Sequence, residues 1–507
     1  AAVLPLPSRA APVAHPPAVA VWPRAAPRVR DTAALAAAVA DGPPAPVFVA
    51  DPTFYRSGMA ADARLCFLHE SLTGLDDRYA SLGSGLALRH GDPAAILDAL
   101  PVDRIYVNRS VTARYGRERD DRLFERDDVT TFAADGLDRT DRARGEYDWQ
   151  AQADAYFDAD PIRAPETLPP NPLDDGPTVE AVERAHGVDP TKRDAPTGGL
   201  AAAWERLRTF AAGLDRYPGG IADPAAAEER TSHLSPYLQF GCLSVREAKR
   251  YVDREGTDPR GRRLFEERCY WNRHYSQKLV DWPGWTERAV NPVFRGLFRD
   301  RHDPDLAAAW KRGETGFPLV DASMRALRET GWLNFRTRAM CAAFYTYICQ
   351  CWWKEGADHF YRHLIDGDAA INYTQWQSQS NLTGVHPVRL YDPRKQVREH
   401  DPDGTFVRRY VPELRDLPTE HLDRPERTPL AVQESSGVHI GEDYPRPVVD
   451  FEARRDETRR LFSRLADRAR EALSDPEVRR RASLSQRHGR ETGDDDDESG
   501  QRRLDDF

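Results

Sequence analysis

Residues 17–50, "PAVAVWPRAAPRVRDTAALAAAVADGPPAPVFVA", place a β-prone run, a helix-prone segment and a second β-prone run one after another. The runs "PAVAVW" (17–22) and "APVFVA" (45–50) are short and almost wholly apolar, which is typical of strands covered on both faces. The alanine-rich "DTAALAAAVA" (31–40) lies between them. The order strand, helix, strand predicts a parallel sheet covered by helices.

The same alternation continues to about residue 145. Two more β-prone runs follow, "GLALRHG" (85–91) and "DRIYVNR" (103–109), and between the second and third runs residues 61–83 carry leucines at helical spacing. We therefore expect a Rossmann-like α/β domain over residues 17–145. No GxGxxG motif follows the first strand, so this domain gives no sign of a dinucleotide site.

The rest of the chain divides into three parts. Residues 146–199, with "DPIRAPETLPPNPLDDGPTVE", are rich in proline and aspartate and predict an interdomain linker. Residues 200–480 are helical in pattern almost throughout, with Met340, Phe344, Ile348 and Cys351 marking one buried stripe, and predict an all-α domain. Residues 481–507 form a charged tail that we expect to be disordered.

The composition is acidic and poor in lysine. The 507 residues include 82 Asp and Glu against 72 Lys and Arg, a net charge of -10, and only six of the basic residues are lysine. This halophilic-type bias indicates adaptation to a salt-rich cytoplasm or a GC-rich genome and identifies no partner. The first 20 residues lack a basic start and their apolar run is broken by prolines, so we expect no signal peptide and no membrane anchor.

The six cysteines form no CxxC pair and lie in apolar segments. We expect buried free thiols in a reducing, cytoplasmic protein, and their spacing disfavours an iron–sulfur cluster.

Tryptophan is concentrated in the helical part. Eight of the eleven tryptophans fall between Trp271 and Trp376. A large helical core would explain each one singly, because tryptophan fills space and its N–H finds a partner. Their crowding also fits a flat aromatic ligand or a route for electrons.

The segment "ERTSHLSPYLQFGCLSVRE" (229–247) places the hydroxyls of Thr231, Ser232 and Ser235 where a helix-like run begins. Free N–H groups at a helix start suit a phosphate, although ordinary N-capping by Thr or Ser would explain the same residues. The sequence alone leaves both interpretations open.

Two further segments concern buried charge. Arg336 and Arg338 lie in an apolar part of "GETGFPLVDASMRALRETGWLNFRTRAM" (313–340), and a buried arginine needs an anionic partner. "LIDGDAAINYTQWQ" (364–377) supplies Asp366 and Asp368 on either side of Gly367. These acids could hold a metal, or Asp366 could pair with an arginine while Gly367 lets the chain approach a flat ring.

These motifs, in this order, resemble the photolyase/cryptochrome family of blue-light flavoproteins. The segments that carry the resemblance include "TSHLSPYLQFGCLS", "GETGFPLVDASMRALRETGW", "LIDGD", "YDPRKQ" and "YPRPVVD". The resemblance implies an α/β antenna domain joined to an all-helical domain that holds FAD, with a possible second antenna chromophore whose type the sequence does not indicate.

The resemblance also implies roles for individual residues in binding FAD. Asp366 would pair with Arg338 beside the flavin, Asp368 would bind the ribityl or ring region, Asn372 would face the flavin N5, and Trp332 would pack beside the cofactor. The flavin diphosphate would be held by Tyr217, Thr231, Ser232, Leu234 and Ser235. No metal is expected in this arrangement.

For electron transfer, Trp376 and Trp353 match the inner two members of the family's tryptophan relay. The third, outermost position is Asp300, and the nearby Phe298 is too hard to oxidise to replace a tryptophan.

For DNA repair, Trp271 matches a residue that lines the lesion cavity in base-flipping photolyases. The position where many cyclobutane-dimer enzymes have glutamate is Arg268, and the histidine pair of animal-type (6–4) enzymes is absent. DNA phosphates would meet basic residues that could equally be a solvated charged face: Arg389, Arg394, Lys395, Arg398, Arg408 and Arg409.

Three functions stay open from the sequence. The first is a light-driven photolyase acting on UV-damaged DNA, the second a cryptochrome-like photoreceptor without repair activity, and the third a metal-dependent transferase using Asp366 and Asp368. The sequence indicates no membrane contact and no particular protein partner.

Overall fold

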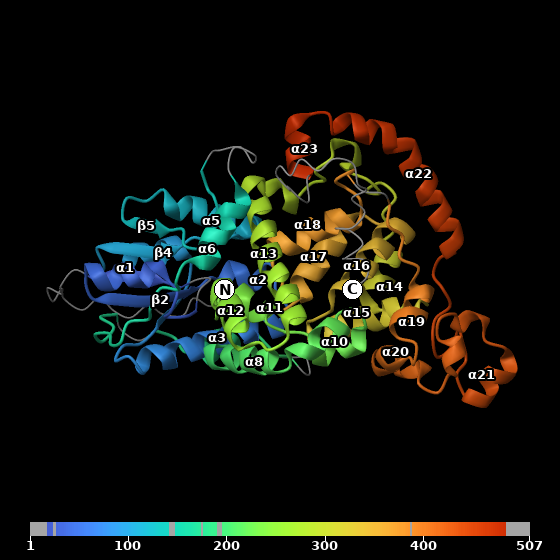
Figure 1. The fold of residues 1–507 in the computed structure, drawn as a ribbon, viewed down its shortest axis with the longest axis horizontal. Coiled ribbons are helices and arrows are strands. Elements are labelled where there is room, and N and C mark those ends of the chain that lie inside the picture. The colour runs from blue at the N-terminus through green and yellow to red at the C-terminus, as the bar shows by residue number, and fades with distance from the viewer. Residues whose placement is uncertain are drawn as a thin grey trace.

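A computed structural model describes residues 18–23, 27–140, 148–173, 176–189, 195–385 and 388–482. An α/β domain at the N-terminal end lies beside a larger helical domain (Figure 1). Most of the predicted tail, residues 483–507, lies outside the described residues.

The α/β domain is built on a five-stranded sheet whose paired strands are all parallel, in the order β3-β2-β1-β4-β5. The four predicted strands are confirmed. The fifth was missed because its sequence, "VTTF", is short and only partly buried at the sheet edge. The strands are β1 (Val19–Trp22), β2 (Pro44–Ala50), β3 (Ala87–His90), β4 (Arg104–Asn108) and β5 (Val129–Phe132).

Alternate residues of each strand point to opposite faces of the sheet, and each face has its own core. Val19 and Val21 pack in one cluster with Leu35 of α1 and Leu75 of α3, whereas Ala20 and Trp22 belong to a second cluster on the other face. This explains why the strands read as continuous apolar runs. The helices are α1 (Ala33–Asp41), α2 (Pro52–Arg56), α3 (Asp62–Ala80), α4 (Pro93–Ala99) and α5 (Arg114–Phe124).

The segment predicted to be an irregular linker contains two helices, α6 (Trp149–Asp158) and α7 (Val179–His186). Tyr156 and Phe157 of α6 pack into the helical domain, and Val182 of α7 packs against the sheet. The sequence pattern of residues 146–199 did not indicate these two helices. The two helices are short and lie in a proline-rich segment, which made them hard to predict. Asp148 and Thr178 cap their N-termini, as is common for Asp and Thr.

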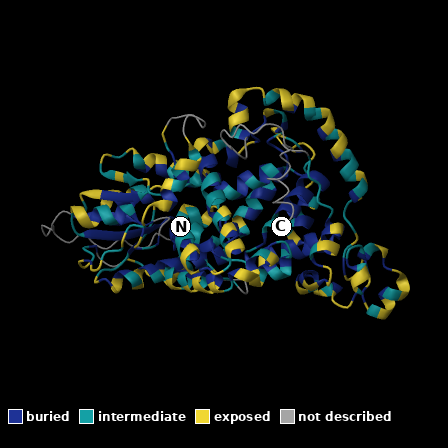
Figure 2. Cartoon of the chain, in the orientation of Figure 1, coloured by how far each residue is buried: buried dark blue, intermediate teal, exposed yellow. Residues whose placement is uncertain are grey.

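The helical domain surrounds α18, which lies near its centre among largely buried helices (Figures 1 and 2). The stripe from Met340 to Cys351 is buried as predicted, but it is not one helix, because a π-helical turn at Phe344–Ile348 interrupts it. The helices are α8 (Leu200–Ala212), α9 (Tyr217–Gly220), α10 (Pro224–Arg230), α11 (Ser235–Phe240), α12 (Val245–Glu255), α13 (Pro259–Asp281), α14 (Pro304–Arg312), α15 (Pro318–Thr330), α16 (Phe335–Ala343), α17 (Trp353–His363), α18 (Ala369–Gln379), α19 (Pro393–His400), α20 (Thr405–Tyr410), α21 (Leu430–Ser436), α22 (Phe451–Ala472) and α23 (Pro476–Ala482). Short 3₁₀ turns lie at Leu214–Arg216, Pro283–Thr286, Pro292–Phe294, Pro412–Leu414, Thr419–His421 and Pro425–Arg427.

Buried arginines join the two domains. Arg246 of α12 pairs with Asp31, and Arg64 of α3 donates hydrogen bonds of 2.7 Å to the carbonyls of Tyr361 and Gly367. A Cβ at Gly367 would lie 2.7 Å from the Arg64 guanidinium and 2.7 Å from the Tyr361 carbonyl oxygen. Glycine is therefore required there by the domain contact. The prediction that Gly367 makes room for a flat ring gains no support from this geometry.

All six cysteines are free, and five of them are buried, as predicted. Among the described residues, none of the helices has both the length and the apolar character needed to cross a membrane.

Candidate functional site

A cavity of about 320 Å³ opens between α11, α13, α16 and α18. Most of its wall is apolar, with a few polar groups at defined places, which is the usual make-up of a small-molecule site. The predicted residues that line it are Tyr217, Thr231, Ser232, Ser235, Arg268, Trp271, Trp332, Arg338, Asp366, Asp368, Asn372 and Trp376.

The polar end of the cavity is the loop before α11. The residue preceding this helix is Leu234, which has no side-chain capping bond, so the hydroxyls of Thr231 and Ser232 do not cap α11. Arg206 donates to the carbonyl oxygens of both residues, at 2.7 and 2.8 Å, and fixes the loop. The N-capping interpretation is therefore wrong for α11. The Leu234 side chain is fully buried in the core and does not line the cavity, so only its backbone could reach a ligand.

Arg338 and Asp366 form the predicted ion pair. One guanidinium nitrogen lies 2.9 and 3.1 Å from the two carboxylate oxygens, and Arg338 Nε donates to the carbonyl of Leu333 at 2.8 Å. The Asp366 side chain is only 4% exposed and that of Arg338 is 24% exposed. The pair places a fixed cation and a fixed anion side by side on the cavity wall.

Asp368 has a different partner from Asp366. It caps α18 by accepting a hydrogen bond from the amide of Ile371 at 3.0 Å. Burial raises the pKa of its carboxyl, although this capping bond and the charge of Arg273 oppose the rise. Within the described ranges, no group of three or more His, Cys, Asp and Glu side chains could hold a metal ion. Asp366 thus pairs with an arginine and Asp368 caps a helix, and neither interaction supports the hypothesis that the two acids bind a metal.

Asn372 and Trp376 lie on the same side of α18, four residues apart. The Asn372 amide donates to the carbonyl of Ala357 at 2.9 Å, which fixes its orientation toward the cavity. Trp376 is 3% exposed, and its buried indole nitrogen has no hydrogen-bond partner among the residues that the structure describes. A buried unpaired donor on a cavity wall is a cost that a bound polar ligand could remove. Trp353, by contrast, is buried in α17 and does not line the cavity.

His233 is a cavity residue that sequence reasoning missed. Its backbone is left-handed (φ +47°), and its ring lies 4.3 Å from that of Trp332. Burial and the nearby Arg206 lower the pKa of His233 to about 4, so the ring is neutral at neutral pH. His233 lies inside the motif "TSHLSPYLQFGCLS", but the sequence around it does not distinguish a cavity residue from a histidine of the core.

The residues predicted to contact DNA do not all lie together. Trp271 and Arg268 line the cavity, whereas Lys395 is exposed beside Glu399 and outside it. Arg394 is 7% exposed, and its guanidinium pairs with Glu426 at 3.0 Å and Glu452 at 2.9 Å. The expectation that Arg394 meets a phosphate gains no support from this geometry, because both terminal nitrogens of its guanidinium already pair with carboxylates.

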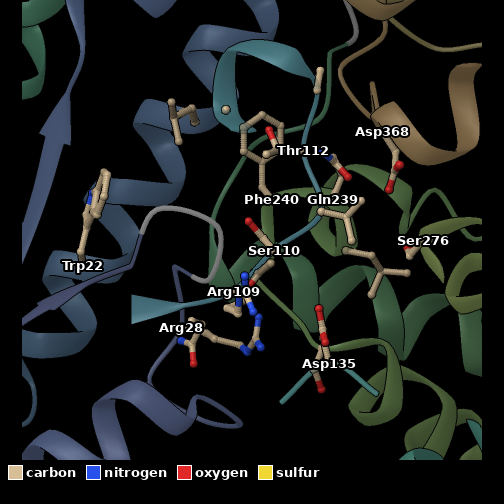
Figure 3. A pocket seen from close by; sticks show the side chains of 18 of the residues that line it. Trp22, Arg28, Arg109, Ser110, Thr112, Asp135, Gln239, Phe240, Ser276 and Asp368 are labelled. Atoms are coloured by element: carbon tan, nitrogen blue, oxygen red, sulfur yellow. The ribbon is translucent and has the colours of Figure 1, made fainter. Parts of the chain in front are cut away.

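A second cavity, of about 270 Å³, lies at the carboxyl edge of the sheet (Figure 3). Its wall includes Trp22 and Asn108, the last residues of the adjacent strands β1 and β4. The chain leaves β1 toward β2 on one side and returns to β4 on the other, which makes this edge the topological switch point where open α/β sheets bind ligands. Asp368 and Gln239 line both cavities, so the two spaces adjoin.

The first cavity suits an elongated ligand that has a polar, anionic end and a flat aromatic end. The hydroxyl-bearing loop suits the former, while Asn372, Trp332 and Trp376 suit the latter. The fold and this cavity together define a two-domain flavin-binding protein.

Comparisons with known proteins agree with this description. Residues 19–134 match the family "DNA photolyase", and residues 265–464 match "FAD binding domain of DNA photolyase". The chain belongs to the photolyase/cryptochrome family, and its helical domain is the FAD-binding domain.

Three relatives show the range of the family. A deoxyribodipyrimidine photo-lyase of Halobacterium salinarum is 31% identical over 87% of this chain and 98% of its own length. A cryptochrome DASH of Natronomonas pharaonis is 30% identical, over 86% and 98%. The crystal structure of a bacterial class III photolyase from Agrobacterium tumefaciens superposes with a TM-score of 0.76 at 26% identity, covering 91% of this chain and all of that one.

Proposed function

We propose that the protein is a DNA photolyase that uses blue light and reduced FAD to split pyrimidine dimers in UV-damaged DNA. The observation that carries the proposal is the continuity of one cavity. Trp271, the residue assigned to the lesion, lines the same space as the residues assigned to FAD other than Leu234. The two linked pyrimidines of the lesion, flipped out of the duplex, could therefore stack beside the cofactor.

The chain's own residues would contribute positioning and electrostatics. FAD supplies the light-driven electron when it is bound. The loop at Thr231 and Ser232 would hold its anionic part. The Arg338–Asp366 pair would lie beside the flavin ring, and the fixed amide of Asn372 would meet that ring. On the lesion side, Trp271 packs 5.6 Å from Tyr275, whose hydroxyl is hydrogen-bonded to Gln375 at the cavity wall. This arrangement would offer the extruded bases an aromatic face and polar edges.

A photoreceptor without repair activity is the alternative, and Arg268 favours it. This residue stands on the cavity wall where many dimer-repair enzymes carry a glutamate, and relatives named cryptochrome match the chain about as well as relatives named photo-lyase. Under this alternative FAD would bind and respond to light, but the cavity would not process a lesion.

A repair assay separates the two functions. The purified protein, reduced and lit with blue light, is mixed with a UV-irradiated oligonucleotide, and the remaining dimers are counted by chromatography against a dark control. Trp271→Ala should lose repair and keep FAD. Trp204→Ala is the matched control, because Trp204 is also half-buried in the helical domain but lies outside both cavities. Dimers that persist under light with FAD fully bound would reject the repair function.

We also propose that the sheet-edge cavity holds a second, light-gathering chromophore. Arg28 and Arg109 line it from the α/β domain, opposite Asp368 of the helical domain, so an anionic ligand would be bound across the domain boundary and next to FAD (Figure 3). Ser110→Trp would fill this space. It should remove any absorption band that is not FAD's while leaving the flavin in place. A second band that survives this variant would place the chromophore elsewhere.

The free thiols support a cytoplasmic location as part of this proposal, because disulfides are rare in reducing compartments.

A further inference from the structure

The rings that touch Trp376 are not those that the family resemblance suggested. Its ring centroid lies 6.1 Å from that of Trp310, 6.0 Å from that of Tyr345 and 5.2 Å from that of Phe360, each at a steep angle. Within the described part of the chain, Trp353 makes no direct ring contact with Trp376. Electron donors to Trp376 should therefore be sought first among its immediate neighbours.

The expected outer end of the relay is also missing. Asp300 is exposed at the surface, and a carboxylate is too hard to oxidise to give an electron to a tryptophan radical. Phe298 beside it is buried and lacks an oxidisable ring. A positive charge that moved from Trp376 to Trp353 could thus not move on to a tryptophan at the outermost relay position, which is Asp300.

Of the aromatic neighbours of Trp376, Tyr345 is a poor donor. Oxidation of a phenol is favourable only when its proton can leave, and the Tyr345 hydroxyl is fully buried, with no carboxylate, imidazole or backbone carbonyl hydrogen-bonded to it among the described residues. The group near it is the thiol of Cys351, whose own pKa burial raises to about 11, so this thiol is no proton acceptor. Phe360 is excluded because an unsubstituted ring is too hard to oxidise.

Trp310 has the properties that Tyr345 lacks. An indole can give up an electron and keep its N–H proton, so the absence of a hydrogen-bond partner at the Trp310 nitrogen is no obstacle. The residue is fully buried, stacked on Phe360 at 5.6 Å with an interplanar angle of 13°, and held on α14. Its position is therefore rigid relative to Trp376.

We infer that Trp310 is a second electron donor to Trp376, parallel to Trp353, during light-driven reduction of the bound flavin. The inference rests on the proposed function, since it needs bound FAD. One electron leaves the Trp376 indole for the flavin, and one electron from Trp310 then refills Trp376. The positive charge remains on the Trp310 indole, which keeps its proton, until a small thiol in solution supplies the replacing electron, releases its own proton to water and is left as a thiyl radical.

The test compares three variants: Trp310→Phe, Trp353→Phe and both together. FAD occupancy and thermal melting of the cofactor-free protein establish that each variant is folded. Photoreduction under blue light with a thiol reductant should slow several-fold in each single variant and stop in the double variant. Tyr345→Phe is the matched control, because the Tyr345 ring lies 6.0 Å from that of Trp376 against 6.1 Å for Trp310, and this variant should be photoreduced at the wild-type rate.

A second measurement covers the case in which Trp310→Phe fails to fold. Ring-fluorinated tryptophan at position 310 keeps the shape but is harder to oxidise, and it should shorten the life of the tryptophan radical seen by flash absorption and electron paramagnetic resonance. Wild-type photoreduction and an unchanged radical in both the Trp310→Phe and fluorinated proteins, with FAD fully bound, would overturn the inference. A wild-type protein that binds no FAD would instead reject the proposed function itself.

Discussion

Replacing Asp366 by asparagine should weaken both the helical domain and its hold on FAD. The change keeps the size of the side chain and removes its charge, so that Arg338 loses its carboxylate partner at 2.9 and 3.1 Å. Breaking a buried ion pair from one side costs about 3–5 kcal/mol. Arg338 is 24% exposed and keeps its bond to the Leu333 carbonyl, and asparagine can still accept one hydrogen bond, so we expect a cost at or below the lower limit, about 2–3 kcal/mol.

The consequence for the cofactor follows from the same pair. If about 2 kcal/mol of this cost falls on the flavin-bound state, FAD binding weakens roughly thirtyfold. Urea unfolding of the cofactor-free protein measures the stability, and titration with FAD followed by flavin fluorescence measures the binding. The control is Glu457→Gln, which removes a surface partner of Arg301 and should cost no more than about 1 kcal/mol. Wild-type FAD affinity in Asp366→Asn, at full stability, would refute the role given to this pair.

Three further outcomes are expected. Trp376→Phe should slow flavin photoreduction strongly at unchanged FAD occupancy, and an unchanged rate in blue light would remove Trp376 from the relay. The pKa of His233 is lowered from 6.5 to about 4, so the neutral, buried ring stabilises the fold above pH 6.5, and this contribution is lost as the pH falls toward 4. His233→Gln should lack this part of the acid sensitivity, which is measured by thermal melting at pH values from 7 to 4. Burial opposes the ionisation of Asp31, but the bonds from Arg246 and Ser244 outweigh it and lower its pKa below 3.8, so the domain contact is stable above that pH and is lost below it. Asp31→Asn should loosen this contact already at pH 7, seen as faster limited proteolysis between the domains, and equal proteolysis would count against the pair.

Much of the fold could be predicted because each strand or helix shows its burial in its own stretch of sequence. Strands buried on both faces must be apolar at nearly every position, so the first four strands are visible as runs in the sequence. The helical domain is visible for a similar reason, since its apolar residues recur at three and four. Elements that depend less on their own burial were missed, namely the edge strand β5 and the linker helices α6 and α7.

The candidate site was predicted through motifs, and its partners were only partly predictable. The pairing of Arg338 with Asp366 could be proposed because a buried arginine requires a carboxylate. The DNA contact predicted for Arg394 did not rest on this rule, and its partners Glu426 and Glu452 come from a turn and a helix that no spacing connects to it.

The sequence by itself determined the two-domain architecture, the family and many of the residues that line the first cavity, because these depend on local periodicity and on short, contiguous motifs. Only the tertiary structure decided which residues meet across the chain. Arg64 fills the space beside Gly367, Asp368 borders two adjoining cavities, and Trp310 touches Trp376. The physical reason is that such contacts are set by the packing of helices far apart in sequence, and an amino-acid pattern specifies which face a helix buries but not which ring it meets there.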